Sequence, residues 1–261
     1  MENWQANKHH YDGYWGKLHN KLQRDKHKFN DIKEEWLDLF KFECGGIASY
    51  AYILDGETVY GDFIQYTNDK NHYLQKRLDT YVTLTTDAII DLGSGWGRHG
   101  IQLSFNNPKY TNIICGELSD GGRGINEYFI KKYNLPIETF SFNWQDHQSL
   151  IDLLKDRNYK EIVIFTSNTI EQIPYLNEEV FTDLIDLPID KISVIHIEPV
   201  AFQYNSTEFP FYNHYNRNLK NVLDNIEKKQ LIEIKEIVHQ YYGHSTNSTS
   251  QNNILIEWIK I

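Results

Sequence analysis

The sequence predicts an α/β fold: a doubly wound, mostly parallel seven-stranded sheet with a terminal antiparallel hairpin and an N-terminal helical cap. Three observations carry this prediction. A glycine-rich turn directly follows an apolar run at residues 88–92, β-rich and helical stretches alternate after it, and the last two β-rich runs have no helix between them. The chain is therefore expected to contain a cap over residues 1–87 and an α/β domain over residues 88–261.

Length and composition narrow the class of protein. The chain has 261 residues and a formal net charge of -10, which argues against nucleic-acid binding because that affinity comes largely from clustered Lys and Arg. No run reaches the roughly 18 apolar residues of a membrane span, so we expect a soluble, cytoplasmic protein without a membrane partner. The two cysteines, Cys44 and Cys115, lie far apart, and we expect neither a disulfide framework nor a metal site.

The middle of the chain has the pattern of βαβ units. Helical stretches at 123–133 and 147–156 alternate with short runs rich in β-branched residues. Such alternation predicts a parallel sheet covered on both faces. The expected strands are residues 88–92, 111–117, 137–142, 161–167 and 191–199.

The two ends of the chain differ from this pattern. After a helical stretch at 214–229, residues 230–242 and 252–261 alternate in polarity and are joined by a polar loop, which predicts an antiparallel hairpin. Before residue 88 the chain reads as mostly helical, for example at 31–42 and 72–84. We expect this part to lie over the carboxyl edge of the sheet.

The glycine turn indicates a ligand site. In open α/β sheets, ligands bind outside the carboxyl ends of the strands, where a glycine turn lets the backbone approach them closely. Gly95-x-Gly97-x-x-Gly100 matches the dinucleotide fingerprint, and Glu117 follows Gly95 by 22 residues, near the spacing for a ribose-binding carboxylate. The register argues against a dinucleotide, because the strand ends at Leu92 and the turn begins at Gly93.

The stretch Asp91-Leu92-Gly93-Ser94-Gly95-Trp96-Gly97 resembles motif I of the class I S-adenosylmethionine-dependent methyltransferases. The resemblance extends over residues 88–261 in element order, and it implies a Rossmann-like domain with S-adenosylmethionine as cofactor. It implies that the turn approaches the methionyl and ribose parts and that Glu117 accepts both ribose hydroxyls. The cofactor residues expected from it are Asp91, Gly93, Ser94, Gly95, Gly97, Glu117, Leu118, Trp144, Gln145, Asp146 and Ser167.

An aromatic cluster near the start of the chain extends this resemblance. Tyr11, Tyr14 and Trp15 resemble the N-terminal lids that fold over the cofactor in some family members. Aromatic rings also suit a sulfonium cation. We expect Tyr14 and Trp15 in the cofactor site, with ordinary packing as the alternative.

Polar residues after the fourth and fifth strands are the candidates for chemistry. His196 and Glu198 are two positions apart and share one side of a regular strand, so His196 is a plausible base oriented by Glu198; a core histidine is an equal alternative. Glu171 is the further candidate. Arg217 suits an acidic acceptor group or a neighbouring acid. The expected acceptor-binding residues are Asn168, Gln172, Tyr212, Tyr215, Asn216 and Arg217.

These features predict a methyltransferase that acts on a polar small molecule at oxygen or nitrogen. A sugar, an amino acid derivative or a short peptide natural product suits the polar residues better than a lipid does. Two other functions stay open: an NAD-type oxidoreductase that uses Gly95, Gly97 and Gly100, and a nucleotide-binding protein without catalysis.

Overall fold

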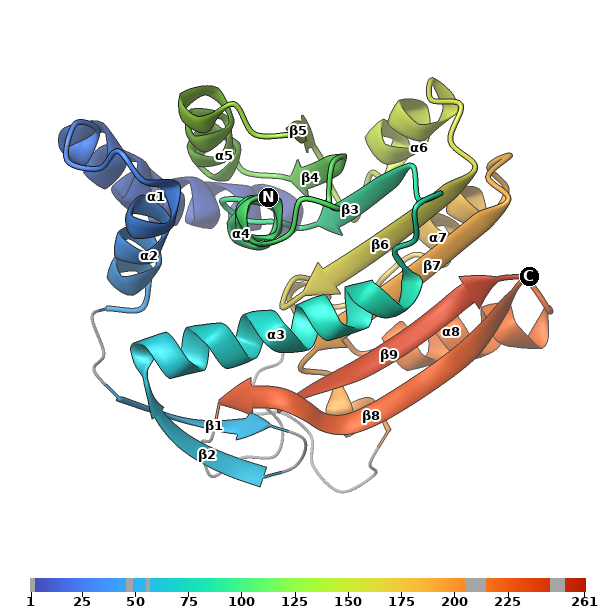
Figure 1. Ribbon diagram of the computed structural model, residues 1–261. Helices are drawn as coiled ribbons and strands as arrows, with labels where there is room; N and C mark the ends of the chain where they lie inside the picture. Colours follow the sequence, from blue (N-terminus) through green and yellow to red (C-terminus); the bar gives the residue numbers. More distant parts are fainter. Residues whose placement is uncertain (1–2, 46–48, 55–56, 205–214, 245–251) are drawn as a thin grey trace. The chain divides into compact units, whose positions relative to one another are not determined.

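The computed structural model describes residues 3–45, 49–54, 57–204, 215–244 and 252–261 (Figure 1). Internal contacts divide the chain into two units, and each unit combines two separate stretches. The first unit contains residues 1–48 and 88–143, and the second contains residues 49–87 and 144–261. Within the described ranges, no helix is long and apolar enough to span a membrane.

A parallel sheet with the strand order β3-β4-β5 forms the centre of the first unit. Every residue of β3 and β4 is buried, as expected for parallel strands with both faces covered. Helix α1 packs on α5, and α2 packs on α4. The elements are α1 (Asn3–Asp25), α2 (Ile32–Glu43), β3 (Ala88–Leu92), α4 (Arg98–Asn106), β4 (Ile113–Glu117), α5 (Asp120–Tyr133) and β5 (Ile137–Ser141).

A buried carboxylate joins the N-terminal helices to α5. Glu35 on α2 is 1% exposed and accepts hydrogen bonds from Lys132 Nζ at 2.8 Å and Tyr133 Oη at 2.6 Å. Lys132 also donates to the backbone carbonyls of Lys26 and Phe29, in the segment between α1 and α2. Because a buried charge requires such partners, this ion pair fixes the segment that joins α1 to α2 against α5.

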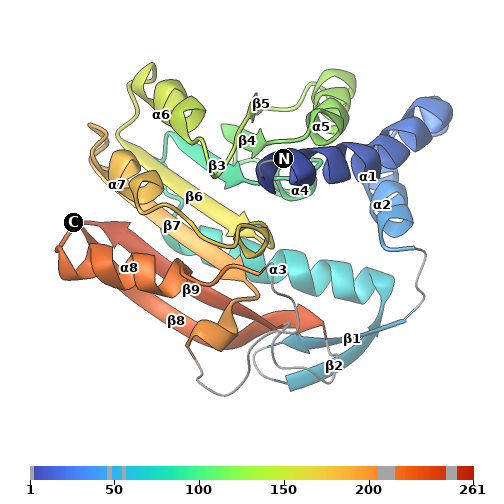
Figure 2. The ribbon, with the colours of Figure 1, turned by 180° about the vertical axis from the view of Figure 1, so that it is seen from behind.

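The second unit contains a mixed sheet with the strand order β2-β1-β8-β9-β7-β6. Strands β6 and β7 are parallel, and the other neighbouring pairs are antiparallel. Helix α3 lies across β8 and β9 in Figure 1, whereas α7 and α8 cover the opposite face in Figure 2. The elements are β1 (Ser49–Leu54), β2 (Glu57–Asp62), α3 (Phe63–Tyr81), α6 (Gln148–Lys155), β6 (Glu161–Ser167), η1 (Ile170–Gln172), α7 (Glu179–Ile185), β7 (Lys191–Glu198), η2 (Ala201–Gln203), α8 (Leu219–Lys228), β8 (Ile232–His244) and β9 (Asn252–Lys260).

The fold class predicted from the sequence is confirmed. The bounds of β3 and β6 equal the expected ones, and β8 and β9 form the antiparallel ending. The chain passes from the second unit to the first at residue 88; the expected division into a cap and an α/β domain stays a prediction.

The segment before residue 88 differs from the expected helical cap. Residues 49–54 and 57–62 are strands, so the described residues contain nine strands rather than seven. The sequence carried a signal for this hairpin, because an Asp-Gly dipeptide separates two runs of β-forming residues. Helix α3 packs on the hairpin of β8 and β9, where Tyr81 Oη donates to Glu257 Oε2 at 2.9 Å. This part of the chain therefore covers a face of the sheet in the second unit, and the placement of a cap over the carboxyl edge stays a prediction.

Candidate functional site

The turn after β3 depends on three glycines. Gly93, Gly95 and Gly97 have φ angles of 76°, 57° and 78°, the left-handed region in which a side chain is strained. A Cβ atom on Gly97 would lie 2.5 Å from the amide carbon of Asn126, so the position also lacks room. The backbone N–H of Gly93 donates to Gly116 O at 2.8 Å, which ties the turn to β4. The turn therefore begins at Gly93, as the sequence predicted.

Two buried polar groups beside the turn lack partners. Asp91 is 1% exposed and Ser94 is 8% exposed, yet neither Asp91 Oδ2 nor Ser94 Oγ has a hydrogen-bond partner among the described residues. Burial raises the pKa of Asp91 to about 8. An unpaired buried polar group costs about 1–3 kcal/mol, so such groups indicate a position where a ligand supplies the missing partner.

Glu117 ends β4 next to the turn. Its Oε2 accepts a hydrogen bond from Gly95 N at 2.9 Å, and its Oε1 accepts from Ser119 N at 2.9 Å and Ser119 Oγ at 2.5 Å. Burial raises the pKa of Glu117, while the hydrogen bonds from Ser119 and Gly95 lower it. The sequence reading missed Ser119, although a serine between a strand and a helix is a typical N-cap. Here Ser119 caps α5 and also fixes Glu117.

The aromatic cluster of α1 reaches the same turn. Trp15 is 8% exposed, and its Cζ2 would lie 3.1 Å from a Cβ atom built on Gly95. Tyr14 packs edge-on against Trp15 but remains 37% exposed. Of the three predicted lid residues, Trp15 lies against the glycine turn.

In the second unit, His196 is a core residue. It is fully buried, its Nε2 accepts from Trp258 Nε1 at 3.1 Å, and its Nδ1 lies 3.0 Å from Thr166 Oγ1. Because an indole nitrogen only donates, Nε2 must be unprotonated, and the ring proton on Nδ1 is donated to Thr166. Burial lowers the pKa of His196 to about 3. This geometry corrects the hypothesis of a catalytic base, because both ring nitrogens are already bonded within the core.

Glu198 reaches His196 indirectly, because the Thr166 side chain is hydrogen-bonded to both residues. Its fully buried carboxylate accepts hydrogen bonds from the backbone N–H of Thr169 at 3.0 Å and of Glu171 at 3.4 Å. Burial and the nearby Glu171 carboxylate raise the pKa of Glu198 to about 8. Glu198 therefore holds the η1 turn, which carries Glu171.

Three of the predicted residues meet at this turn. The Glu171 carboxylate receives hydrogen bonds from the side chains of Asn168 and Gln172. Burial raises the pKa of Glu171, and these two donors and the charge of Lys70 lower it. Asn168 has a φ of 57°, uncommon for a residue with a side chain and frequent at functional sites.

The amide of Asn168 is held by a residue that the sequence reading did not identify. Asn253 on β9 donates to Asn168 Oδ1 at 3.1 Å, and Asn168 Nδ2 donates to Asn253 Oδ1 at 3.3 Å. This reciprocal pair joins Asn168, which follows β6, to β9. No local pattern reveals it, because 85 residues separate the two positions.

The expected acceptor residues near α8 have structural contacts. Asn216 is fully buried; its Nδ2 donates to Ile173 O at 2.7 Å, and its Oδ1 accepts from Leu219 N at 2.8 Å at the start of α8. This corrects the acceptor-binding prediction for Asn216. The backbone N–H of Arg217 donates to Pro174 O at 2.9 Å, and Tyr215 is half-buried. Tyr212 lies outside the described residues.

Leu118 follows β4 in the first unit, and the four other predicted cofactor residues belong to the second unit. Trp144 is buried and donates from Nε1 to Thr169 Oγ1 at 3.3 Å. Gln145 and Asp146 are exposed, and Ser167 is the last residue of β6. Their role in binding a cofactor stays a prediction.

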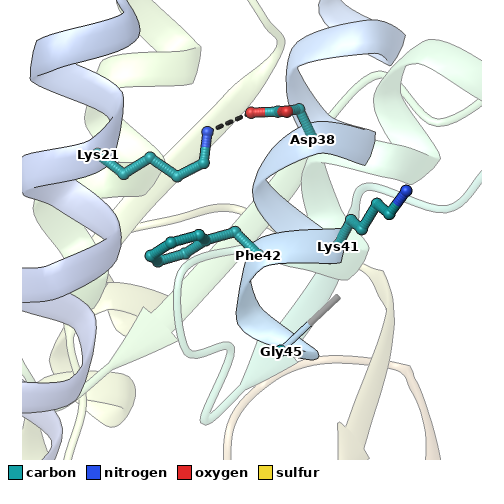
Figure 3. Close-up of a pocket in the computed structure, with 5 residues that line it drawn as sticks. All are labelled: Lys21, Asp38, Lys41, Phe42 and Gly45. Atoms are coloured by element: carbon teal, nitrogen blue, oxygen red, sulfur yellow. Dashed lines mark hydrogen bonds and ion pairs between the residues drawn. The ribbon is translucent and has the colours of Figure 1, made fainter. Parts of the chain in front are cut away.

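A separate cavity of about 390 Å³ lies in the first unit (Figure 3). Lys21 on its wall is already paired with Asp38 and with Asp25, the latter at 2.9 Å, so its charge is neutralised. Among the described residues, none of the predicted site residues lines this cavity, which is bounded by Lys21, Asp38, Lys41, Phe42 and Gly45.

Known protein structures resemble this arrangement, although no family model and no curated protein sequence matches the chain. An O-methyltransferase from Bacillus cereus in complex with S-adenosylhomocysteine aligns with a TM-score of 0.51 and 14% identity over 74% of this chain and 80% of that one. A geranyl diphosphate C-methyltransferase from Streptomyces coelicolor A3(2) aligns with a TM-score of 0.52 and 9% identity over 77% and 81% of the two chains.

A third structure covers nearly the whole chain. A putative caffeoyl-CoA O-methyltransferase from Staphylococcus aureus aligns with a TM-score of 0.50 and 10% identity over 94% of this chain and 99% of that one. The chain has the class I methyltransferase fold. At these identities the likeness concerns the methyltransferase fold alone, and the role of each residue is argued from its own contacts.

Proposed function

We propose that this protein is an S-adenosylmethionine-dependent methyltransferase. The observation that carries the proposal is the turn after β3, where three left-handed glycines bring backbone close to Glu117 and to the unpartnered Asp91 Oδ2 and Ser94 Oγ. A close backbone, a strand-end carboxylate and a second buried acid suit a ligand that combines a ribose diol with a cationic amino group.

The two acids would have different roles. Glu117, already oriented by Gly95 and Ser119, would accept hydrogen bonds from the vicinal ribose hydroxyls. Asp91 would pair with the amino group, because an opposite charge favours the ionised carboxylate and offsets the burial that raises its pKa to about 8. When bound, S-adenosylmethionine supplies an electrophilic methyl group on a sulfonium.

The acceptor would be a polar small molecule or a short peptide, methylated at oxygen or nitrogen. The support for this is the cluster of Glu171, Asn168 and Gln172. A carboxylate whose pKa is raised toward neutrality is a suitable proton acceptor, since a base works best when its pKa is near the working pH. Glu171 therefore takes the role of base that the sequence first suggested for His196.

Calorimetry with the purified protein tests the cofactor. We expect binding of S-adenosylmethionine and S-adenosylhomocysteine but not of NAD. Glu117→Ala should weaken S-adenosylhomocysteine binding by about 1.5–3 kcal/mol, because charge-assisted hydrogen bonds are lost. Glu57→Ala, at an exposed strand residue, is the control. Binding of NAD alone would contradict the proposal and favour an oxidoreductase. Cofactor binding without methyl transfer to any polar acceptor would favour a nucleotide-binding protein.

A further inference from the structure

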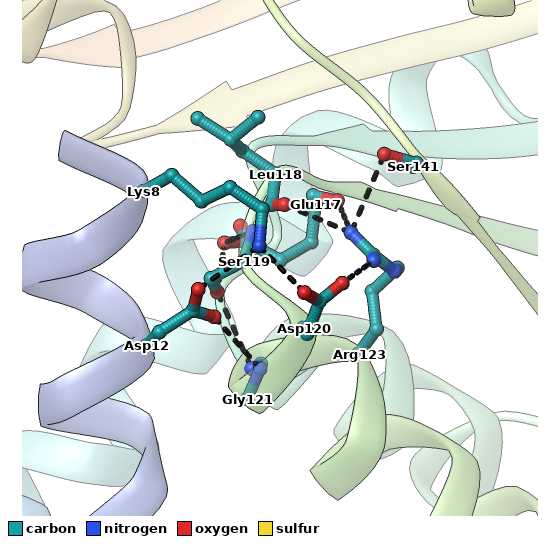
Figure 4. Close-up of polar contacts among 10 residues, drawn as sticks. Lys8, Asp12, Glu117, Leu118, Ser119, Asp120, Gly121, Arg123 and Ser141 are labelled. Atoms are coloured by element: carbon teal, nitrogen blue, oxygen red, sulfur yellow. Dashed lines mark hydrogen bonds and ion pairs between the residues drawn. The ribbon is translucent and has the colours of Figure 1, made fainter. Parts of the chain in front are cut away.

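Helix α1 is joined to the start of α5 by several polar contacts (Figure 4). Lys8 Nζ lies 2.9 Å from Asp12 Oδ2 and 2.6 Å from Asp120 Oδ2. Gly121 N donates to Asp12 Oδ1 at 3.1 Å. One lysine and one carboxylate of α1 thus hold the first turn of α5.

The same turn supports Glu117. Asp120 forms an ion pair with Arg123. Arg123 Nη1 donates to the backbone carbonyls of Glu117 at 2.8 Å and Leu118 at 2.9 Å. The contacts in Figure 4 therefore run without interruption from α1 to the segment that presents the Glu117 carboxylate.

Trp15 lies on the same side of α1 as these residues. Positions 8, 12 and 15 are four and three residues apart, which puts them on one helix face. The Trp15 Cβ would lie 3.1 Å from a Cβ atom built on Gly121. The atoms of its ring nearest to a Cβ atom built on Gly95 are Cζ2, Cη2 and Cε2, and Cε2 is bonded to Nε1. Nε1 is buried and has no hydrogen-bond partner within the described part of the chain. A buried donor beside the glycine turn is available for a ligand.

The two ends of α1 are held with different strength. The C-terminal end continues into the segment that Lys132 fixes through the buried Glu35. The N-terminal end depends on Lys8 and Asp12, whose side chains are 29% and 33% exposed, and on Asp120, which is 68% exposed. Exposed ion pairs are weak and are screened by salt, so the docking of this end responds to small changes.

We propose that Lys8 and Asp12 are positioning residues for cofactor binding, which fix Trp15 over Gly95 and hold the turn that carries Glu117. Trp15 Nε1 then donates a hydrogen bond to the cofactor. This inference rests on the proposed function. In the opposite arrangement, Trp15 blocks the turn and must leave before a ligand enters. Every variant that loosens α1 should then bind the cofactor more tightly instead of more weakly.

Titration calorimetry of the full chain with S-adenosylhomocysteine separates these two arrangements. We expect Lys8→Met to weaken binding about threefold and Asp12→Ala about tenfold, the range for partly exposed polar contacts. Asp12→Asn keeps an acceptor for Gly121 N and should restore most of the affinity. Trp15→Phe keeps the ring but removes the N–H, and a loss of about three- to tenfold is expected. Arg24→Met removes an ion pair of α1 with Asp25 and should leave the affinity unchanged.

The salt dependence of the affinity is a second measurement, and a purely structural role of Lys8 would not change it. Between about 50 and 500 mM salt, the affinity of the natural sequence should fall more steeply than that of Lys8→Met, since the variant lacks the Lys8 ion pairs with Asp12 and Asp120 that salt screens. Equal or tighter binding by Asp12→Ala, with an unchanged circular dichroism spectrum, would overturn the inference and favour a blocking role for Trp15. If the natural sequence itself binds no S-adenosylhomocysteine, the proposed function fails first.

Discussion

Buried polar side chains around the glycine turn differ from those around His196. Beside the turn, Asp91 Oδ2 and Ser94 Oγ are buried without partners among the described residues. In the second unit, both nitrogens of His196 and the Glu198 carboxylate are bonded to other parts of the protein. A polar group whose bonds are complete supports the architecture, whereas one with a missing bond indicates a place for a ligand. The amino-acid types alone do not distinguish the buried polar residues beside the turn from those around His196.

The largest expected effect concerns the glycine turn. Gly95→Val should abolish S-adenosylhomocysteine binding, a loss of about 100-fold or more, because a β-branched residue is strained at a φ of 57° and would meet Trp15 at 3.1 Å. Gly13→Val is the control, since a Cβ atom there meets nothing within 4 Å. Calorimetry measures both. Normal binding by Gly95→Val would show that the turn is not part of a ligand site. The difference between the turn and the core around His196 would then have no functional meaning.

The second effect tests whether His196 is architectural. His196→Phe should lower the free energy of unfolding by about 2–4 kcal/mol, since Trp258 Nε1 and Thr166 would lose their partner in the core. Affinity for S-adenosylhomocysteine should stay the same. Urea unfolding measures the first quantity and calorimetry the second. A stable variant that loses turnover would restore His196 as a base; His27→Phe, at an exposed position, is the control.

The pH dependence of stability sharpens the same test. His196 has a pKa of about 3 in the folded chain, and an unfolded histidine has a pKa of about 6.5. Between these two pKa values, the unfolded chain binds one proton more at this histidine than the folded chain does. The stability that the neutral, buried His196 contributes is therefore present above about pH 6.5 and is lost as the pH falls. Relative to His196→Phe, the natural sequence should lose about 1.4 kcal/mol per pH unit in this window. Parallel pH profiles for both proteins would contradict a buried, neutral His196.

The smallest expected effect concerns Glu171, the one acid of the second unit that we assign to chemistry. Asn168→Ala removes a donor that stabilises the Glu171 carboxylate, so the pKa of Glu171 should rise further. Asn253→Ala should act in the same direction with a smaller shift. Carbon-13 NMR titration of protein labelled at its glutamates measures the pKa of Glu171 without a methyl acceptor. The Glu171 signal is assigned by its loss in Glu171→Gln. Asn177→Ala, which removes a donor from the exposed Glu179, should leave Glu171 unchanged; an unshifted Glu171 in Asn168→Ala would exclude the contact.

The sequence by itself determined the features that depend on neighbouring residues. Strand β3, the glycine turn that begins at Gly93, and the antiparallel ending all follow from local polarity patterns and from the backbone freedom of glycine. The hairpin at residues 49–62 had a local signal too, which the expectation of a helical cap overlooked.

Only the tertiary structure decided which buried polar groups have partners. Trp258 reaches His196 across 62 residues, Asn253 reaches Asn168 across 85, and Gly121 reaches Asp12 across 109. A local pattern shows that a side chain is polar and lies at the end of a strand, but its hydrogen bonds depend on which distant segment packs beside it. For this reason the sequence could predict a ligand site at the glycine turn, yet it could not tell a core histidine from a catalytic one.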